Sequence, residues 1–156
     1  LGINAKDMTT EEMAITANAI YDLSALSRST KDGGKKIQYT MRLYVKDNSG
    51  DYKQTNDISK YLSSFTLENA TSSSGLNGKE CVFTTDYNGE EQNTAVTKFT
   101  VKTGKAFEEQ GLTYANYRVE LTAVLLNDNN SVVNGTTSSD YVVYTNAKIE
   151  TGFINS

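Results

Sequence analysis

The amino-acid sequence predicts an all-β fold, an antiparallel β-sandwich of the immunoglobulin-like or a related type, with about eight or nine strands and one or two short helical turns. Several stretches alternate apolar and polar residues with a period of two, the pattern of strands that have one buried face. Clusters of glycine, asparagine, aspartate and serine separate these stretches and indicate turns. The chain of 156 residues contains no proline, so no strand is interrupted by that residue.

The N-terminal part is less regular than the rest. Residues 1–10 are polar and are expected to form a linker or a terminal arm, whereas residues 11–156 are expected to form a single β-sandwich domain excised from a larger multidomain protein. Residues 13–23 alternate, which favours a strand. Two threonines followed by two glutamates precede this stretch and also fit a helix start, so a helix is the alternative. Residues 27–36 are charged, contain two glycines and are predicted to form a loop.

The middle of the chain has the cleanest alternation, over residues 37–45. A tight turn at 47–51 follows, and a return strand begins at Tyr52. The remaining elements predicted here are a helical turn at 57–62, strands at 65–67, 80–85 and 95–102, loops at 70–78 and 86–93, and a crossing segment at 105–114 whose residues 107–111 fit a short helix.

The C-terminal third is predicted to contain two long strands around a polar turn. The first strand, residues 117–125, has tyrosine and aliphatic residues at every second position. The turn at 127–130 consists of asparagine and aspartate, whose short side chains bond their own backbone. The second strand, residues 141–149, places Tyr141 on one face and Tyr144 on the other, more polar face.

Composition excludes several classes of partner and cofactor. The net charge of −4 and the pI near 4.9 give no basic surface for nucleic acid, and no apolar run approaches the roughly 20 residues of a membrane-spanning helix. The chain has no histidine and a single cysteine, so the commonest metal ligand and any internal disulfide are absent and no cofactor is expected. Cys81 shares a strand face with Phe83 and is predicted to be an inert core residue.

Acidic residues provide no recognisable catalytic or metal site. The glutamate pairs at 11–12, 90–91 and 108–109 are adjacent in sequence, and neighbours on a strand face opposite ways. The chain also lacks the nucleophile motifs of the serine hydrolases. We therefore expect no enzymatic activity. The turns at 47–51 and 128–130 offer oxygen ligands for calcium, but they lack the spacing of an EF-hand loop, and turn formation explains them without a metal.

Three tyrosines are candidate binding residues. Tyr44 and Tyr144 fall on the polar faces of their predicted strands, and Tyr52 lies beside a turn. Aromatic rings at such positions can bind a sugar or a peptide. They also pair across strands and stabilise a sheet, which is the alternative explanation.

An intramolecular crosslink is the second candidate feature. Lysine and asparagine side chains can condense to an amide when both are buried beside a carboxylic acid, because desolvation leaves the lysine neutral and nucleophilic. Lys36 and Lys46 lie at the ends of one predicted strand, Glu120 on a neighbouring strand and Asn146 on the last. An uncrosslinked sandwich is the alternative, and an intact mass lower by one ammonia would identify the crosslink.

Three segments, RLYVKDNSGDY, YRVELTAVLL and SSDYVVYTNAKI, resemble parts of Gram-positive bacterial cell-surface proteins, the adhesin-like and pilin-like proteins built from β-sandwich modules. The resemblance implies a non-enzymatic extracellular module, structural or adhesive, at the cell surface or cell wall. Its implied partners are neighbouring domains of the same surface protein and a host protein or glycan ligand. A carbohydrate-binding module attached to a secreted enzyme and a phage or viral attachment domain are the alternatives.

Overall fold

The computed structural model describes residues 1–9, 14–103, 116–145 and 149–151; for 5–9, 144–145 and 149–151 it describes the backbone alone. Its elements in chain order are β1 (Gly2–Thr9), β2 (Ala14–Asp22), α1 (Arg28–Asp32), β3 (Lys36–Lys46), β4 (Tyr52–Gln54), the 3-10 turn η1 (Ile58–Lys60), β5 (Ser64–Leu67), β6 (Ala70–Ser73), β7 (Cys81–Asp86), β8 (Thr94–Lys102), β9 (Asn116–Leu126), β10 (Ser138–Thr145) and β11 (Ile149–Thr151).

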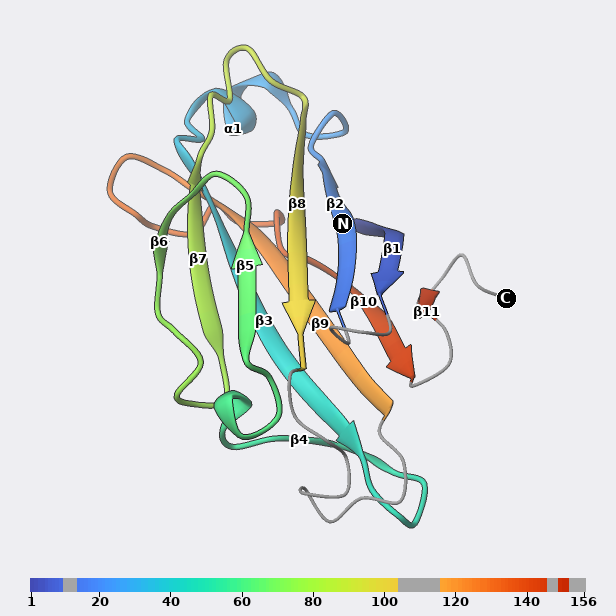
Figure 1. Cartoon of the computed structure of the whole chain (residues 1–156). Coiled ribbons are helices and arrows are strands. Elements are labelled where there is room, and N and C mark those ends of the chain that lie inside the picture. Colours follow the sequence, from blue (N-terminus) through green and yellow to red (C-terminus); the bar gives the residue numbers. More distant parts are fainter. Residues whose placement is uncertain (10–13, 104–115, 146–148, 152–156) are drawn as a thin grey trace.

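Two antiparallel sheets form the sandwich. The smaller sheet has the strand order β1-β2-β8-β5, and the larger has the order β11-β10-β9-β3-β7-β6, with β4 paired to the end of β3. Figure 1 shows β2, β8 and β5 crossing in front of the strands of the larger sheet. The predicted all-β antiparallel sandwich is therefore confirmed. None of the described helices is long and apolar enough to cross a membrane.

Strands β3 and β9 lie at the centre of the larger sheet and carry the clearest sequence pattern. Strand β3 alternates strictly between buried and partly exposed residues, and β9 does so as far as Leu125, after which Leu126 is also buried. They pair over ten positions, from Lys36 opposite Leu126 to Val45 opposite Tyr117. Because a slip of one residue would turn every apolar side chain outward, the shared pattern fixes this register.

Aromatic rings join the two sheets inside the core. The ring of Phe65 on β5 lies 5.4 Å from that of Phe99 on β8, in the same sheet, and 5.3 Å from that of Phe83 on β7 in the opposite sheet. Cys81, also on β7, is buried and free, as its apolar surroundings predicted. The core is thus filled by large rings from both layers, in the way expected of face-to-face sheets.

Strand β1 ties the smaller sheet to the larger. Within residues 1–10, which are predicted to be a linker or a docked terminal arm, Gly2–Thr9 pairs with β2, and Ile3 is fully buried. The backbone N–H of Ile3 donates a 2.8 Å hydrogen bond to the buried carboxylate of Asp140 on β10. Burial raises the pKa of Asp140 above its usual value, while hydrogen bonds from the backbone N–H groups of Tyr141 and Ile3 partly offset this rise.

This raised pKa predicts the sign of a pH effect on stability. A carboxyl group whose pKa is higher in the folded state adds stability below its unfolded pKa, and that contribution is lost as the pH rises through the folded pKa. Asp140→Asn keeps an oxygen acceptor for Ile3 but cannot titrate. We therefore expect the wild type to gain stability relative to Asp140→Asn as the pH falls from 7 to about 3.5. Urea unfolding at several pH values measures this difference, and parallel pH profiles would contradict it.

Several local predictions are confirmed and two are corrected. Residues 14–22 form a strand and not the alternative helix, and the helical turn near 58–60 is present. Within the predicted loop 27–36, however, Arg28–Asp32 forms a short helix whose N-terminus is capped by the Ser27 hydroxyl, which accepts from the Thr30 N–H. The predicted loop 70–78 begins with strand β6, an exposed edge strand of small polar residues that gives no alternation.

The C-terminal strand is also shorter than predicted. The expected strand over 141–149 starts earlier, at Ser138, and ends at Thr145; Ile149–Thr151 then pairs back onto it as β11. With β1, β6 and β11, the described residues contain eleven strands, where the sequence predicts about eight or nine. The helix expected at 107–111 lies outside the described residues.

Candidate binding site on the larger sheet

The outer face of the larger sheet gathers polar and aromatic side chains from its central strands. Since Leu43 and Val45 point into the core, the intervening Tyr44 and the flanking Arg42 point outward. In the same way Arg118 and Glu120 alternate with the buried residues of β9. Polar positions distant in sequence therefore share one surface.

Four residues form a cluster on this surface, which we call the Tyr-Arg cluster: Tyr44, Tyr52, Arg118 and Tyr141. The guanidinium carbon of Arg118 lies 4.7 Å from the ring centre of Tyr141, 4.8 Å from that of Tyr52 and 5.7 Å from that of Tyr44. All three distances are within the range of cation–π attraction. The strand register explains the arrangement. Arg118 lies directly opposite Tyr44 on β3 and opposite Val143 on β10, and Tyr141 is two residues before Val143 on the same strand.

The charge of Arg118 is not neutralised by a carboxylate in the part of the chain that the structure describes. Its Nε atom is buried and has no hydrogen-bond acceptor there. A second cation lies beside the cluster, since the Lys46 ammonium is 5.7 Å from the Tyr52 ring centre. The cluster and the adjacent Lys46 therefore combine three aromatic rings with two positive charges.

Arg42 on the same face has the opposite environment. Its guanidinium lies 2.5 Å from a carboxylate oxygen of Glu80 and 3.6 Å from one of Glu120, and it contacts the Thr122 hydroxyl at 3.4 Å. Two acidic partners thus neutralise Arg42, while aromatic rings surround Arg118. The pair provides a matched comparison within one surface.

The structure brings together two of the three tyrosines predicted from the sequence. Tyr44 and Tyr52 belong to the cluster, and for Tyr144 only the backbone is described, paired with Tyr117 and Ile149. Tyr141 is not among the residues predicted from the sequence, because the sequence pattern predicts Tyr144 on the exposed face of this strand. In the structure Val142 is fully buried and Tyr141 is half-exposed. The burial of Val142 shows which of the two strand faces points outward.

The residues proposed for a crosslink lie apart. Glu120 pairs with Arg42, which is six residues from Lys36 and four from Lys46 along β3. At about 3.3 Å per residue, these separations are roughly 20 Å and 13 Å. The structure therefore brings neither lysine beside Glu120, and Asn146 lies outside the described residues. The crosslink stays a prediction that intact mass can test.

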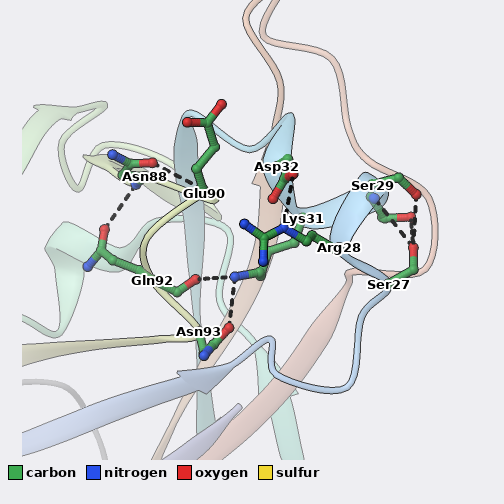
Figure 2. A network of polar contacts seen from close by, with 10 residues as sticks. Ser27, Arg28, Ser29, Lys31, Asp32, Asn88, Glu90, Gln92 and Asn93 are labelled. Atoms are coloured by element: carbon green, nitrogen blue, oxygen red, sulfur yellow. Dashed lines mark hydrogen bonds and ion pairs between the residues drawn. The ribbon is translucent and has the colours of Figure 1, made fainter.

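A different lysine meets an asparagine at one end of the sandwich. The ammonium of Lys31, which is 8% exposed, donates to the side-chain oxygen of Asn93 at 2.7 Å and to the backbone oxygen of Gln92 at 3.1 Å. Figure 2 shows these bonds linking helix α1 to the loop between β7 and β8. The two bonds satisfy a buried charge and fasten two loops that lie more than sixty residues apart in sequence.

In the two polar turns, side-chain oxygens accept hydrogen bonds from the backbone of the same turn. One oxygen of Asp47 accepts from the backbone N–H groups of Ser49 and Asp51, and the other lies 3.0 Å from the Lys53 ammonium. Hydrogen bonds from Ser49 and Lys53 hold the pKa of the Asp47 carboxyl well below its usual value. The Asn127 side chain caps its turn similarly, by accepting from Asn129 and Ser131. These contacts are those of turn-forming residues.

Comparison with known proteins gives a likeness of fold. No protein-family model matches the chain, and no curated protein matches its sequence. Among solved structures it is similar to the collagen-binding domain of a Staphylococcus aureus adhesin, with 9% identity, a TM-score of 0.38 and coverage of 90% of this chain and 94% of that chain. It is also similar to a structure of Fap1 fimbriae of Streptococcus parasanguinis, with 14% identity, a TM-score of 0.46 and coverage of 92% and 78%.

A third similar structure has an unrelated role. It is the DNA-binding domain of Cep-1 from C. elegans, with 6% identity, a TM-score of 0.39 and coverage of 85% of this chain and 76% of that chain. The first two neighbours are a collagen-binding adhesin domain and a structure of fimbriae. Because a fold does not by itself determine a function, the function of this chain has to follow from its own residues.

Proposed function

We propose that the chain is a non-enzymatic, extracellular module of a Gram-positive bacterial surface protein, and that it binds a host protein or glycan through the Tyr-Arg cluster. The observation that carries the proposal is the gathering of Tyr44, Tyr52 and Tyr141 around Arg118 on an outer sheet face. Tyrosine and arginine are the residue types that most often dominate binding energy at protein interfaces.

Tyrosine side chains suit such a surface for a physical reason. Each supplies a large amphipathic ring while losing the freedom of only two rotatable bonds, so little entropy is lost when a ligand binds. Here the rings are already held in place by the central guanidinium, and all four residues are partly exposed. The surface therefore combines contact area with preorganisation, which lowers the cost of binding.

The position of the cluster also suits a module that works within a longer protein. It lies on the face of the larger sheet, supported from below by the fully buried Leu43, Val119 and Leu121. Neighbouring domains joined at the chain ends would leave a sheet face accessible. The structural role, as one rigid sandwich among several, is compatible with this adhesive role.

Substitution of the cluster tyrosines tests the proposal. Tyr44→Ala and Tyr52→Ala are each expected to weaken binding about tenfold or more, because truncating an aromatic anchor at a binding surface has effects of that size. Binding would be measured on a panel of immobilised extracellular-matrix proteins, including collagen, and of glycans. Thermal unfolding of each variant establishes that the domain is still folded.

Val96→Ala is the matched control. Val96 is 58% exposed and lies on β8 of the other sheet, so its truncation should leave binding unchanged. Unchanged binding by both tyrosine variants, with wild-type binding present, would show that the ligand uses another surface.

A further inference from the structure

We infer that the Tyr-Arg cluster binds an acidic saccharide, a sugar that carries a carboxylate or sulfate group, with the anion held by Arg118. The inference rests on the proposed binding function and adds the chemical class of the ligand. It follows from a difference between two arginines of this surface. Arg42 has two carboxylate partners, whereas Arg118 has none among the described residues.

The balance of charge around the cluster favours an anion. Glu120 is paired with Arg42, and Asp47 with Lys53, so the nearby carboxylates are already engaged. Arg118 and Lys46 instead lie against aromatic rings. The whole chain has a net charge of −4, yet this patch keeps two positive charges without acidic partners among the described residues. A patch of that kind attracts an anionic ligand.

The geometry prepares Arg118 for this role. Three rings surround the guanidinium, and its buried Nε atom has no acceptor in the described part of the chain. A guanidinium held by stacking on aromatic rings is partly stripped of water and fixed in orientation. Its fork of N–H donors matches the two oxygens of a carboxylate or sulfate, and such charge-assisted pairs are stronger than neutral hydrogen bonds.

The position of the cluster in the sheet favours a saccharide over a peptide. Peptides commonly bind sheets by adding a strand to a free edge. Tyr44, Arg118 and Tyr141 lie on β3, β9 and β10, and each of these strands is paired on both sides, so an added strand cannot reach them through its backbone. Recognition at these three residues therefore uses side chains, and the tyrosine rings offer apolar contacts to a sugar ring.

A binding titration with defined probes tests the inference. The probes are a heparin-derived hexasaccharide, sialyllactose, neutral lactose and a polyglutamate peptide, each titrated against the whole domain by calorimetry. We expect at least one acidic saccharide to bind, with an affinity that falls as salt is added. Arg118→Gln should weaken that binding about tenfold or more, as expected for the loss of a hydrogen bond to a charged group.

Two further variants control the experiment. Arg28→Gln removes an exposed arginine that pairs with Asp32 within α1, away from the cluster, and should change the affinity by less than about twofold. Arg118→Lys keeps the charge but loses the fork, and it should bind more weakly than the wild type and more tightly than Arg118→Gln. If Arg118→Gln does not fold, the affinity of Arg118→Lys still tests the role of the guanidinium.

The possible outcomes separate this inference from the proposed function. If lactose bound as tightly as the acidic saccharides, the claim that the ligand is recognised by its charge would be overturned. If polyglutamate bound more tightly than the acidic saccharides, the claim that the ligand is a saccharide would be overturned. Failure of all four probes to bind would overturn the inference as a whole. The proposed function would still stand if Tyr44→Ala and Tyr52→Ala weakened binding to a matrix protein while Arg118→Gln had no effect.

Discussion

Phe99→Ala is expected to lower the free energy of unfolding by about 3–5 kcal/mol, the usual cost of removing a large buried aromatic side chain. Phe99 is fully buried on β8, and its ring stacks on Phe65 at 5.4 Å. Through Phe65 it contributes to the contact with Phe83 across the sandwich, at 5.3 Å. The substitution therefore leaves a cavity where the two sheets meet. Urea unfolding followed by circular dichroism measures the change.

Val96→Ala provides the comparison on the same strand. Because the Val96 side chain is 58% exposed, its truncation should alter the free energy of unfolding by no more than about 0.5 kcal/mol. A loss below about 1 kcal/mol for Phe99→Ala would contradict the assignment of this ring to a tightly packed core.

Gly89→Ala is the second substitution with a large expected effect. A Cβ atom at position 89 would lie 1.8 Å from the backbone oxygen of Lys31, which also accepts a 2.9 Å hydrogen bond from Gly34. Backbone atoms cannot move aside as a flexible side chain can, so the loops at this end of the sandwich must separate. We expect a loss of about 3 kcal/mol, at the upper end of the range for overpacking, and a weakened Lys31–Asn93 contact.

Gly33→Ala is the matched control for this loop. Gly33 follows α1 with φ −77° and ψ −8°, values that alanine adopts readily, and an added Cβ would have nothing within 4 Å. Its unfolding free energy should stay equal to that of the wild type or rise by up to about 1 kcal/mol. Equal stability of the Gly33 and Gly89 variants would mean that the two loops are not in contact as described.

The central strands could be predicted from the sequence because their pattern is local. In β3 and β9 every second residue is apolar, and the burial of Ile37, Tyr39, Val119 and Leu121 follows directly from that period. Edge strands such as β6, Ala70–Ser73, lack the signal since neither face is buried. Their pairing depends on the neighbouring strand, which no short window of sequence contains.

The binding site could be predicted only in part. Tyr44 and Tyr52 are recognisable as aromatic residues at outward or turn positions, but Arg118 and Tyr141 join them only through the register of β3, β9 and β10. The same limit applies to Lys31 and Asn93, which lie in two separate predicted loops and meet when the sheets pack.

Backbone amide chemical shifts provide the most direct test of the claim that the Tyr-Arg cluster is the binding surface. The isotope-labelled domain would be titrated with sialyllactose and with the heparin-derived hexasaccharide, and the shift changes mapped along the chain. The account predicts that the largest changes fall around residues 44, 52, 118 and 141, on the outer face of the larger sheet. Changes concentrated on β5 and β8 of the smaller sheet, with the cluster unaffected, would contradict it.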